Sequence, residues 1–265
     1  MKHILTFLLL LTPLTANAQS TQPVEITAQN HLEWNRTDQT FLATGNVQAT
    51  QGTTSITTET LRANYAQGTD GKGLEISDLN ATGAVIIKSD NNTLYGDHAI
   101  YDVTKSYAKM TGKNLRMIAP NQTLTARDRF EYWTQQGRIE ATGNVIITRP
   151  KRGGSGKDTI RANKIIAKLK RNAAGKNQIN IIEATGNVTI TTPLETVTGT
   201  YGIYRAAPNT IELTGGVKIT RGPNTLQGDR ATVNLNTNIS KIFGGATAGT
   251  EDGRVRGVFY PGSQN

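Results

Sequence analysis

Two histidines lie beyond residue 18, and they are the first candidates for metal or acid–base chemistry in a chain without cysteine. His98 directly follows Asp97 and lies four residues before Asp102, so imidazole and carboxylate ligands are close in the sequence. Neighbouring residues of a strand point to opposite faces, however, and the other histidine, His31, is distant in the chain. We therefore interpret His98 as a surface residue and predict no metal site.

The segment 153–157, Gly-Gly-Ser-Gly-Lys, has the composition of a phosphate-binding loop but not its spacing. In such a loop, a glycine precedes the Gly-Lys pair by five positions, and Ser or Thr follows the pair. Here Lys151 takes the first of these positions and Asp158 the second. No Gly-x-Ser-x-Gly nucleophile motif occurs, and no carboxylate pair stands out. We predict neither an enzyme nor a cofactor, and we interpret this segment as a basic hairpin tip.

Residues 1–18 have the pattern of a secretory signal peptide. A basic start precedes an apolar run over 4–14, and Ala16-Asn-Ala18 gives the small-x-small pattern of a cleavage site. The apolar run is too short for a mature transmembrane helix. We expect a cleaved, exported protein in which residues 19–265 form a single domain.

The charge of the chain favours anionic partners. Lys and Arg number 29 against 20 Asp and Glu, a formal net charge of +9. Such an excess attracts acidic lipid head groups, phosphorylated glycans or nucleic acid, and export argues against nucleic acid. A charge that serves solubility alone is the alternative. Without cysteine, the exported fold must depend on its backbone ladders and core.

One short motif recurs along nearly the whole mature sequence. Ala-Thr-Gly-Asn-Val or a close variant occurs five times, and a degenerate copy at 110–117 has one extra residue after its glycine. The five regular copies lie at 43–47, 81–85, 141–145, 184–188 and 213–217. Successive motif glycines are 38, 29, 31, 43 and 29 residues apart, so we predict a repeat protein with loops of unequal length.

A second motif alternates with the first. It starts with Thr and has Gly or Ala three residues later, followed in most copies by a polar residue. Its copies lie at 60–65, 93–98, 123–128, 159–164, 196–201 and 225–230, with an opening copy at 25–30. Each repeat is then a pair of strands. The polar and glycine-rich segments 66–73, 151–158 and 172–177 are expected to be hairpin tips.

The first motif has a period of two residues. Ile139, Ala141, Val145 and Ile147 share one parity, while Glu140 and other mostly polar residues take the opposite one. This is the pattern of a half-buried strand, and its central glycine predicts a bend. The second motif changes its apolar phase midway, which predicts a bulge or corner. The expected fold is all-β, with about 15 antiparallel strands.

The alternating motifs resemble those of the OstA-type family of periplasmic lipopolysaccharide-transport proteins, the LptA family. The family pattern is similar to Ile-Glu-Ala-Thr-Gly-Asn-Val followed by Thr-Leu-x-Gly-Asp-x-Ala, and segments 23–28 and 253–261 resemble its first and last strands. The resemblance implies a slightly twisted β-jellyroll, open along one side. It also implies a periplasmic bridge that carries lipopolysaccharide from the inner to the outer membrane with its acyl chains in an apolar trough.

The resemblance further implies roles for particular residues. The interior face would be lined by Val24, Ile26, Val47, Ala49, Val85, Ile87, Val145, Ile147, Val188, Ile190, Val217 and Ile219. Copies of the chain would assemble head to tail through edges that contain Val24, Ile26, Val255 and Val258. The phase of Leu115 and Met117, after the extra residue of the degenerate motif, stays open.

The partners implied by the resemblance are lipopolysaccharide, an OstA-like protein anchored in the inner membrane, and the N-terminal domain of the outer-membrane lipopolysaccharide translocon. Those two proteins are also the rival identities. A cleavable signal argues against the first, and the lack of a large barrel domain argues against the second. Outside the family, the alternative is a structural or adhesive exported β-solenoid with a closed core. An enzyme on a β-solenoid would need a carboxylate cluster on one sheet face.

Overall fold

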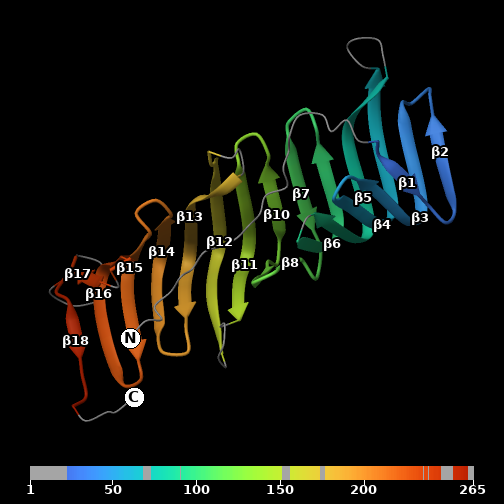
Figure 1. Cartoon of the computed structure of the whole chain (residues 1–265). Helices are drawn as coiled ribbons and strands as arrows, with labels where there is room; N and C mark the ends of the chain where they lie inside the picture. Colours follow the sequence, from blue (N-terminus) through green and yellow to red (C-terminus); the bar gives the residue numbers. More distant parts are fainter. Residues whose placement is uncertain are drawn as a thin grey trace.

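The computed structural model describes residues 23–67, 73–89, 91–150, 156–173, 177–234, 236–237, 239–245 and 253–261. The expected signal peptide and most of segment 153–157 lie outside these residues. The described part contains strands and turns but no helix, and its 18 strands form one antiparallel sheet. The predicted all-β, antiparallel fold is thus confirmed. Figure 1 shows the strands side by side along an elongated sheet that runs from β2 to β18.

The strands follow one another in the chain with few interruptions. Their bounds are β1 Glu25–Thr27, β2 His31–Asn35, β3 Thr40–Gln51, β4 Thr54–Gln67, β5 Leu74–Ser89, β6 Asn92–Asp102, β7 Tyr107–Thr111, β8 Arg116–Ala119, β9 Gln122–Thr125, β10 Arg129–Trp133, β11 Arg138–Pro150, β12 Lys157–Arg171, β13 Asn177–Thr191, β14 Thr196–Arg205, β15 Thr210–Arg221, β16 Asn224–Asn234, β17 Ile239–Phe243 and β18 Arg256–Val258.

Ten of the strands are long, and the two halves of a long strand can pair with different neighbours. The first half of β3 pairs with β2, and its second half pairs with β1. Elsewhere two successive short strands together take the place of one long strand, and each pairs with one half of a neighbour. These are β1 with β2, β7 with β8, β9 with β10, and β17 with β18. The chain therefore forms 14 bent segments, which we call rungs. The expected number of about 15 corresponds to these rungs, four of which are split into two strands each.

The rungs divide the sheet into two walls that meet along a crease. The first wall contains β2, β7, β10, β17 and the halves of the long strands that pair with them. The second wall contains β1, β8, β9, β18 and the other halves. Each wall has its own row of hairpin tips. The strands on either side of the expected hairpin tips are paired, β4 with β5, β11 with β12 and β12 with β13, while residues 68–72, 151–155 and 174–176 of those tips lie outside the described residues.

The crease lies at the glycine of the first motif. Gly143 and Asn144 both have positive φ, 90° and 42°, and together they lie opposite a single residue of β12. Such a bulge redirects the strand. The same pair of positive φ values occurs in the other four regular copies, so the predicted bend is confirmed in each. A Cβ on Gly186 would lie only 2.5 Å from Asn163 Nδ2, which explains the glycine.

One copy of the second motif is misplaced by the sequence pattern. Paired positions put the corner of β4 at Glu59, because Val47 lies opposite Thr58 just as Val188 lies opposite Gly199. The structural equivalent is therefore segment 55–60 rather than 60–65. The prediction was wrong because β4 has Thr58, which is only 2% exposed, at the position where the other copies have glycine or alanine.

Candidate binding trough

The inner faces of the two walls form one continuous apolar lining. Residues next to the crease are small, for example Ala141, Val145, Ala184 and Val188, and each is at most 8% exposed. Larger side chains lie two residues further from the crease on both walls. The apolar side chains that line the space between the walls are therefore small at the crease and larger toward the hairpin tips. Such a lining suits apolar ligands and offers few hydrogen-bonding groups.

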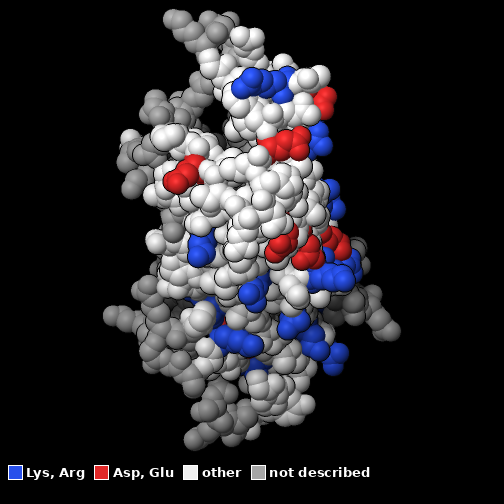
Figure 2. All heavy atoms as spheres, turned by 90° about the vertical axis from the view of Figure 1, so that its right-hand side faces the viewer, with Lys and Arg blue, Asp and Glu red and all other residues white. Residues whose placement is uncertain are grey.

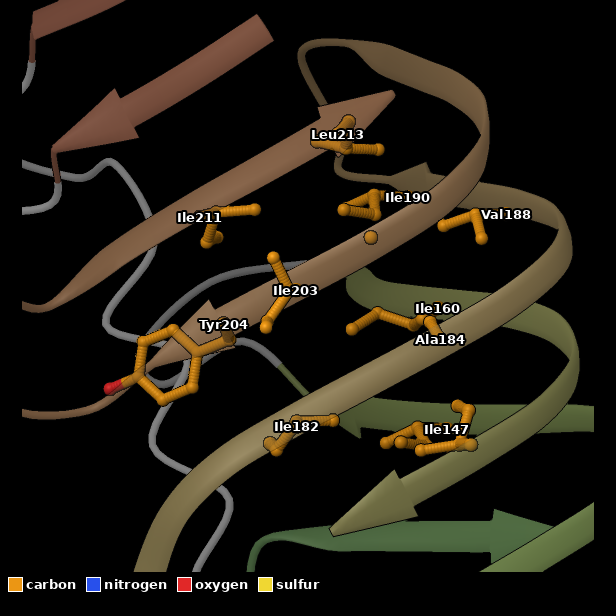
Figure 3. A pocket seen from close by; sticks show the side chains of 12 residues that line it. Ile147, Ile160, Ile182, Ala184, Val188, Ile190, Ile203, Tyr204, Ile211 and Leu213 are labelled. Carbon is orange, nitrogen blue, oxygen red and sulfur yellow. The ribbon is translucent and has the colours of Figure 1, made fainter. Parts of the chain in front are cut away.

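A pocket lies between the walls in the C-terminal half of the sheet. From the first wall it is lined by Ile165, Ile182, Ala184, Gly202, Ile203, Tyr204, Ile211 and Leu213, and from the second wall by Ile147, Ile160, Val188 and Ile190. Figure 3 shows that the lining residues come from several neighbouring strands. Because the two sets come from opposite halves of the rungs, the walls face each other across this space.

The pocket is small, about 50 Å³. By comparison, an engineered cavity that accepts benzene in another protein has a volume of about 150 Å³. An acyl chain is far longer than a benzene ring, so the walls must separate further for such a ligand to enter. The structure therefore shows a trough whose apolar walls are packed close together.

The two ends of the sheet expose apolar side chains. Of the eleven large apolar side chains that are exposed in the described part, seven lie at the ends: Val24, Leu32, Trp34, Ile239, Val255, Phe259 and Tyr260. At the first end, the Trp34 ring stacks on Phe41 with centroids 5.4 Å apart, and its Nε1 donates a hydrogen bond to the Tyr65 hydroxyl. β1 and β2 pair only with β3, and β17 and β18 only with β16, so their outer edges have no strand partner among the described residues.

The polar residues considered for chemistry are engaged separately. His98 Nε2 lies 3.0 Å from Asn80 Oδ1, Asp97 accepts a hydrogen bond from the Lys113 backbone, and Asp102 pairs with Lys105 at 2.7 Å. Across the described residues, no three His, Cys, Asp or Glu side chains are grouped in a way that could hold a metal ion. The same residues contain no helix of the length and hydropathy needed to cross a membrane.

Comparison with protein families decides the kind of ligand. A sequence model of the family described as "LptA/(LptD N-terminal domain) LPS transport protein" matches two overlapping stretches, residues 25–128 and 125–239. The chain belongs to this family. It is accordingly a lipopolysaccharide transport protein rather than an enzyme.

Comparisons with individual proteins are weaker. No curated protein matches the sequence. Among solved structures, one match is the crystal structure of LptH, described as the LptA homologous periplasmic component of the lipopolysaccharide transport device from Pseudomonas aeruginosa. It covers 91% of this chain and 98% of LptH, with 11% sequence identity and a TM-score of 0.22.

Most of the residues expected in the interior line the trough. Ala49 and Ile147 are buried. The five motif valines are each at most 1% exposed: Val47, Val85, Val145, Val188 and Val217. Ile26, Ile87, Ile190 and Ile219 are half-buried against the same core. Val24 differs, since it precedes β1 and is 43% exposed. At the other end, Val255 is exposed and Val258 half-buried.

The expected list omitted the lining of the first wall. Leu61, Ile165, Ile182 and Leu213 are buried and belong to the same core, but they precede the motif glycine or follow the second motif. The alternation of apolar and polar residues along their strands was the sequence signal that could have placed them in the interior. Leu115 and Met117, whose phase the sequence left open, are both buried in this core as well.

The outer face of the first wall is covered by ion pairs. Glu140, expected on this polar face, has a side chain only 4% exposed because Arg138 and Lys164 lie over it, at 2.6 and 2.5 Å. Beside it, burial favours the neutral form of Glu131, but hydrogen bonds from Tyr107 and Arg129 outweigh this and lower the pKa of its carboxyl group. Burial, followed by the hydrogen bond to Glu131, raises the pKa of Tyr107 to about 12.

Proposed function

We propose that this chain is a periplasmic bridge that carries lipopolysaccharide from the inner to the outer membrane, with the acyl chains held between the two walls. The observation that supports this most directly is the apolar lining, which repeats along the sheet with a valine beside every regular corner. Family membership supplies the ligand class. The signal-peptide pattern of residues 1–18 supports a periplasmic location.

The physical basis of the bridge is the cost of exposing hydrocarbon to water. Removing an acyl chain from an apolar environment costs about 0.8 kcal/mol per CH₂, so a lipid with several chains cannot cross an aqueous compartment unaided. A trough that presents similar residues at each rung offers the lipid a series of nearly equal sites. Movement between neighbouring sites then has little net cost, and direction must be supplied by an energy-consuming partner.

Longer bridges require joints at both ends. The edges of β1 and β2 and of β17 and β18 can add strands from another chain, and the exposed apolar side chains at these ends would continue the lining across the joint. The partners that we propose are a second copy of this chain, arranged head to tail, an OstA-like protein anchored in the inner membrane, and the N-terminal domain of the outer-membrane translocon.

A photo-crosslinking amino acid placed on β13 tests the trough. Val188 and Ile190 lie in the lining, while Thr189 between them points to the outer face. We expect a crosslinker at 188 or 190 to capture lipopolysaccharide in cells and one at 189 to capture none. Equal capture at all three positions would refute the inward assignment.

The small pocket gives the alternative, an exported structural or adhesive β-solenoid with a closed core, a specific basis. This alternative predicts no lipid capture at 188 or 190 in a correctly folded protein, and a location outside the cell. Fractionation of the cell envelope together with the crosslinking experiment therefore separates the two functions.

A further inference from the structure

The outer faces of the two walls differ in charge. On the first wall, basic and acidic side chains form ion pairs, as between Lys168 and Glu183 at 2.8 Å and between Arg205 and Glu212 at 3.4 Å. Viewed from the β2 end, the molecule has blue and red side by side along one margin and only blue in its lower part (Figure 2). The positive charge is thus distributed unevenly around the sheet.

Strand pairing defines a row of residues along the outer face of the second wall. From β6 to β18 the paired residues are, in order, Tyr95, Arg116, Thr125, Ile146, Arg161, Thr189, Thr198, Lys218, Gln227 and Arg256. We call this the cation row. Its members face outward because their neighbours in sequence face the core: Arg161 lies between Ile160 and Ala162, and Lys218 between Val217 and Ile219.

Four cations of this row are exposed and evenly spread. The side chains of all four are exposed, and successive members lie three, three and two rungs apart: Arg116, Arg161, Lys218 and Arg256. At about 4.8 Å between neighbouring strands, three rungs correspond to about 14 Å. None of the ion pairs found among the described residues involves these four side chains.

A ladder of threonines runs beside the cation row, two residues further from the crease. Six consecutive strand pairs join seven threonines in register: Thr123, Thr148, Thr159, Thr191, Thr196, Thr220 and Thr225. Within the described residues, neither this ladder nor the cation row contains Asp or Glu between β6 and β18. The wall thus presents parallel rows of hydroxyl groups and cations along the sheet axis.

We infer that the outer face of the second wall binds a linear anionic glycan that lies along the sheet axis. The threonine hydroxyls recur at a spacing close to the length of one sugar unit in an extended glycan, and they can both donate and accept hydrogen bonds. The cations, which recur at longer intervals than the threonines, meet carboxylate groups of the same glycan. Single-stranded nucleic acid would require stacking platforms, and the cation row has only Tyr95, which Arg116 covers at 4.3 Å.

This site is separate from the trough. The glycan would contact the outward side chains of the second wall, whereas the acyl chains would contact the inward ones, so one molecule could bind both. The inference therefore goes beyond the proposed transport function and does not depend on it.

The test is calorimetric titration of the mature protein with oligogalacturonates of increasing length, with neutral cello-oligosaccharides of the same lengths as the control ligand. We expect binding that strengthens with oligomer length and weakens with salt. The variant Arg161→Gln/Lys218→Gln should bind about 2- to 30-fold more weakly, the loss typical of two exposed charge pairs. Thr159→Val/Thr191→Val, which removes two hydroxyl groups and no charge, should also reduce affinity.

The matched control is Lys168→Gln/Arg205→Gln, which removes the same charge from the outer face of the first wall. We expect it to bind the oligomers as tightly as the unmodified protein does. The inference is overturned if no oligomer binds, if galacturonate monomer binds as well as the oligomers, or if the control variant loses as much affinity as Arg161→Gln/Lys218→Gln. Lipid capture at position 188 or 190 should be unchanged in both variants, so failure of this inference and failure of the transport function are distinguishable.

Discussion

Replacing Gly202 with alanine should stabilise the protein, because the structure leaves room for a methyl group in the trough. Gly202 lines the pocket from β14, where it pairs with Ala184 and Leu213. A Cβ at this position would lie 3.6 Å from Val188 Cγ1, an ordinary van der Waals distance, and 3.9 Å from the nearest atom of Leu213. The backbone is not in the left-handed region, so alanine causes no strain there.

The expected gain has two parts. The added methyl group buries apolar surface worth about 0.8 kcal/mol. Restricting the unfolded chain at this position contributes about 0.4–1 kcal/mol more. We therefore expect Gly202→Ala to raise the free energy of unfolding by about 1–2 kcal/mol, measured by equilibrium urea denaturation of the mature protein.

Gly228 of β16, two rungs along the sheet from Gly202 of β14, provides the matched comparison. A Cβ there would lie 2.6 Å from the backbone oxygen of Phe243, which cannot move without disturbing the β16–β17 pairing. Gly228→Ala should therefore lower the unfolding free energy. If Gly202→Ala destabilises the protein as much as Gly228→Ala does, the space between the walls is not where the structure places it.

Three further outcomes test the corners, the outer face and the ends. Gly186→Ala should lower the unfolding free energy by about 1–2 kcal/mol, since its φ is +77° and a Cβ would overlap Asn163; no loss in urea denaturation would contradict the corner geometry. Because the pKa of Glu131 is lowered in the folded state, its stabilisation should be complete above the ordinary value of 4.5 and lost as the pH falls through the folded-state pKa. Thermal unfolding of Glu131→Gln should thus differ from the unmodified protein at pH 7 and converge with it in acid. Val255→Asp or Val258→Pro should stop concentration-dependent, end-to-end oligomers in light scattering, and unchanged elongation would exclude the β18 end as the joint.

The two-residue periodicity predicted the repeated strands and the inward parity, because alternation on a half-buried strand is a local property. It could not show that Ile182 and Ile190, on either side of one glycine, belong to opposite walls that face each other. That relation depends on the direction change at the corner. The copy at 60–65 was misplaced for a related reason: its alternation is regular, and only strand pairing shows that the corner lies at Glu59.

The ends of the sheet were also only partly predictable. Val255 and Val258 were expected at an edge, but Leu32 and Trp34 were not, although Trp34 is 50% exposed and joins an aromatic cluster with Phe41 and Tyr65. An exposed tryptophan has no distinctive pattern in a sequence. Its significance comes from its place on the last rung, where no further strand is available among the described residues to cover it.

The close approach of the walls and the repetition of the lining together constrain how a lipid could move. At the pocket of about 50 Å³ the walls must separate for an acyl chain to enter, and separating them exposes apolar surface that the incoming acyl chain can cover again. Each regular corner presents a valine that is at most 1% exposed. The free energy gained when a lipid fills one stretch therefore nearly equals the free energy lost when it leaves the previous one. A lining of this kind gives no preferred direction. The protein can hold the lipid out of water along the path, but a net flow must come from the supply of lipid at one end and its removal at the other.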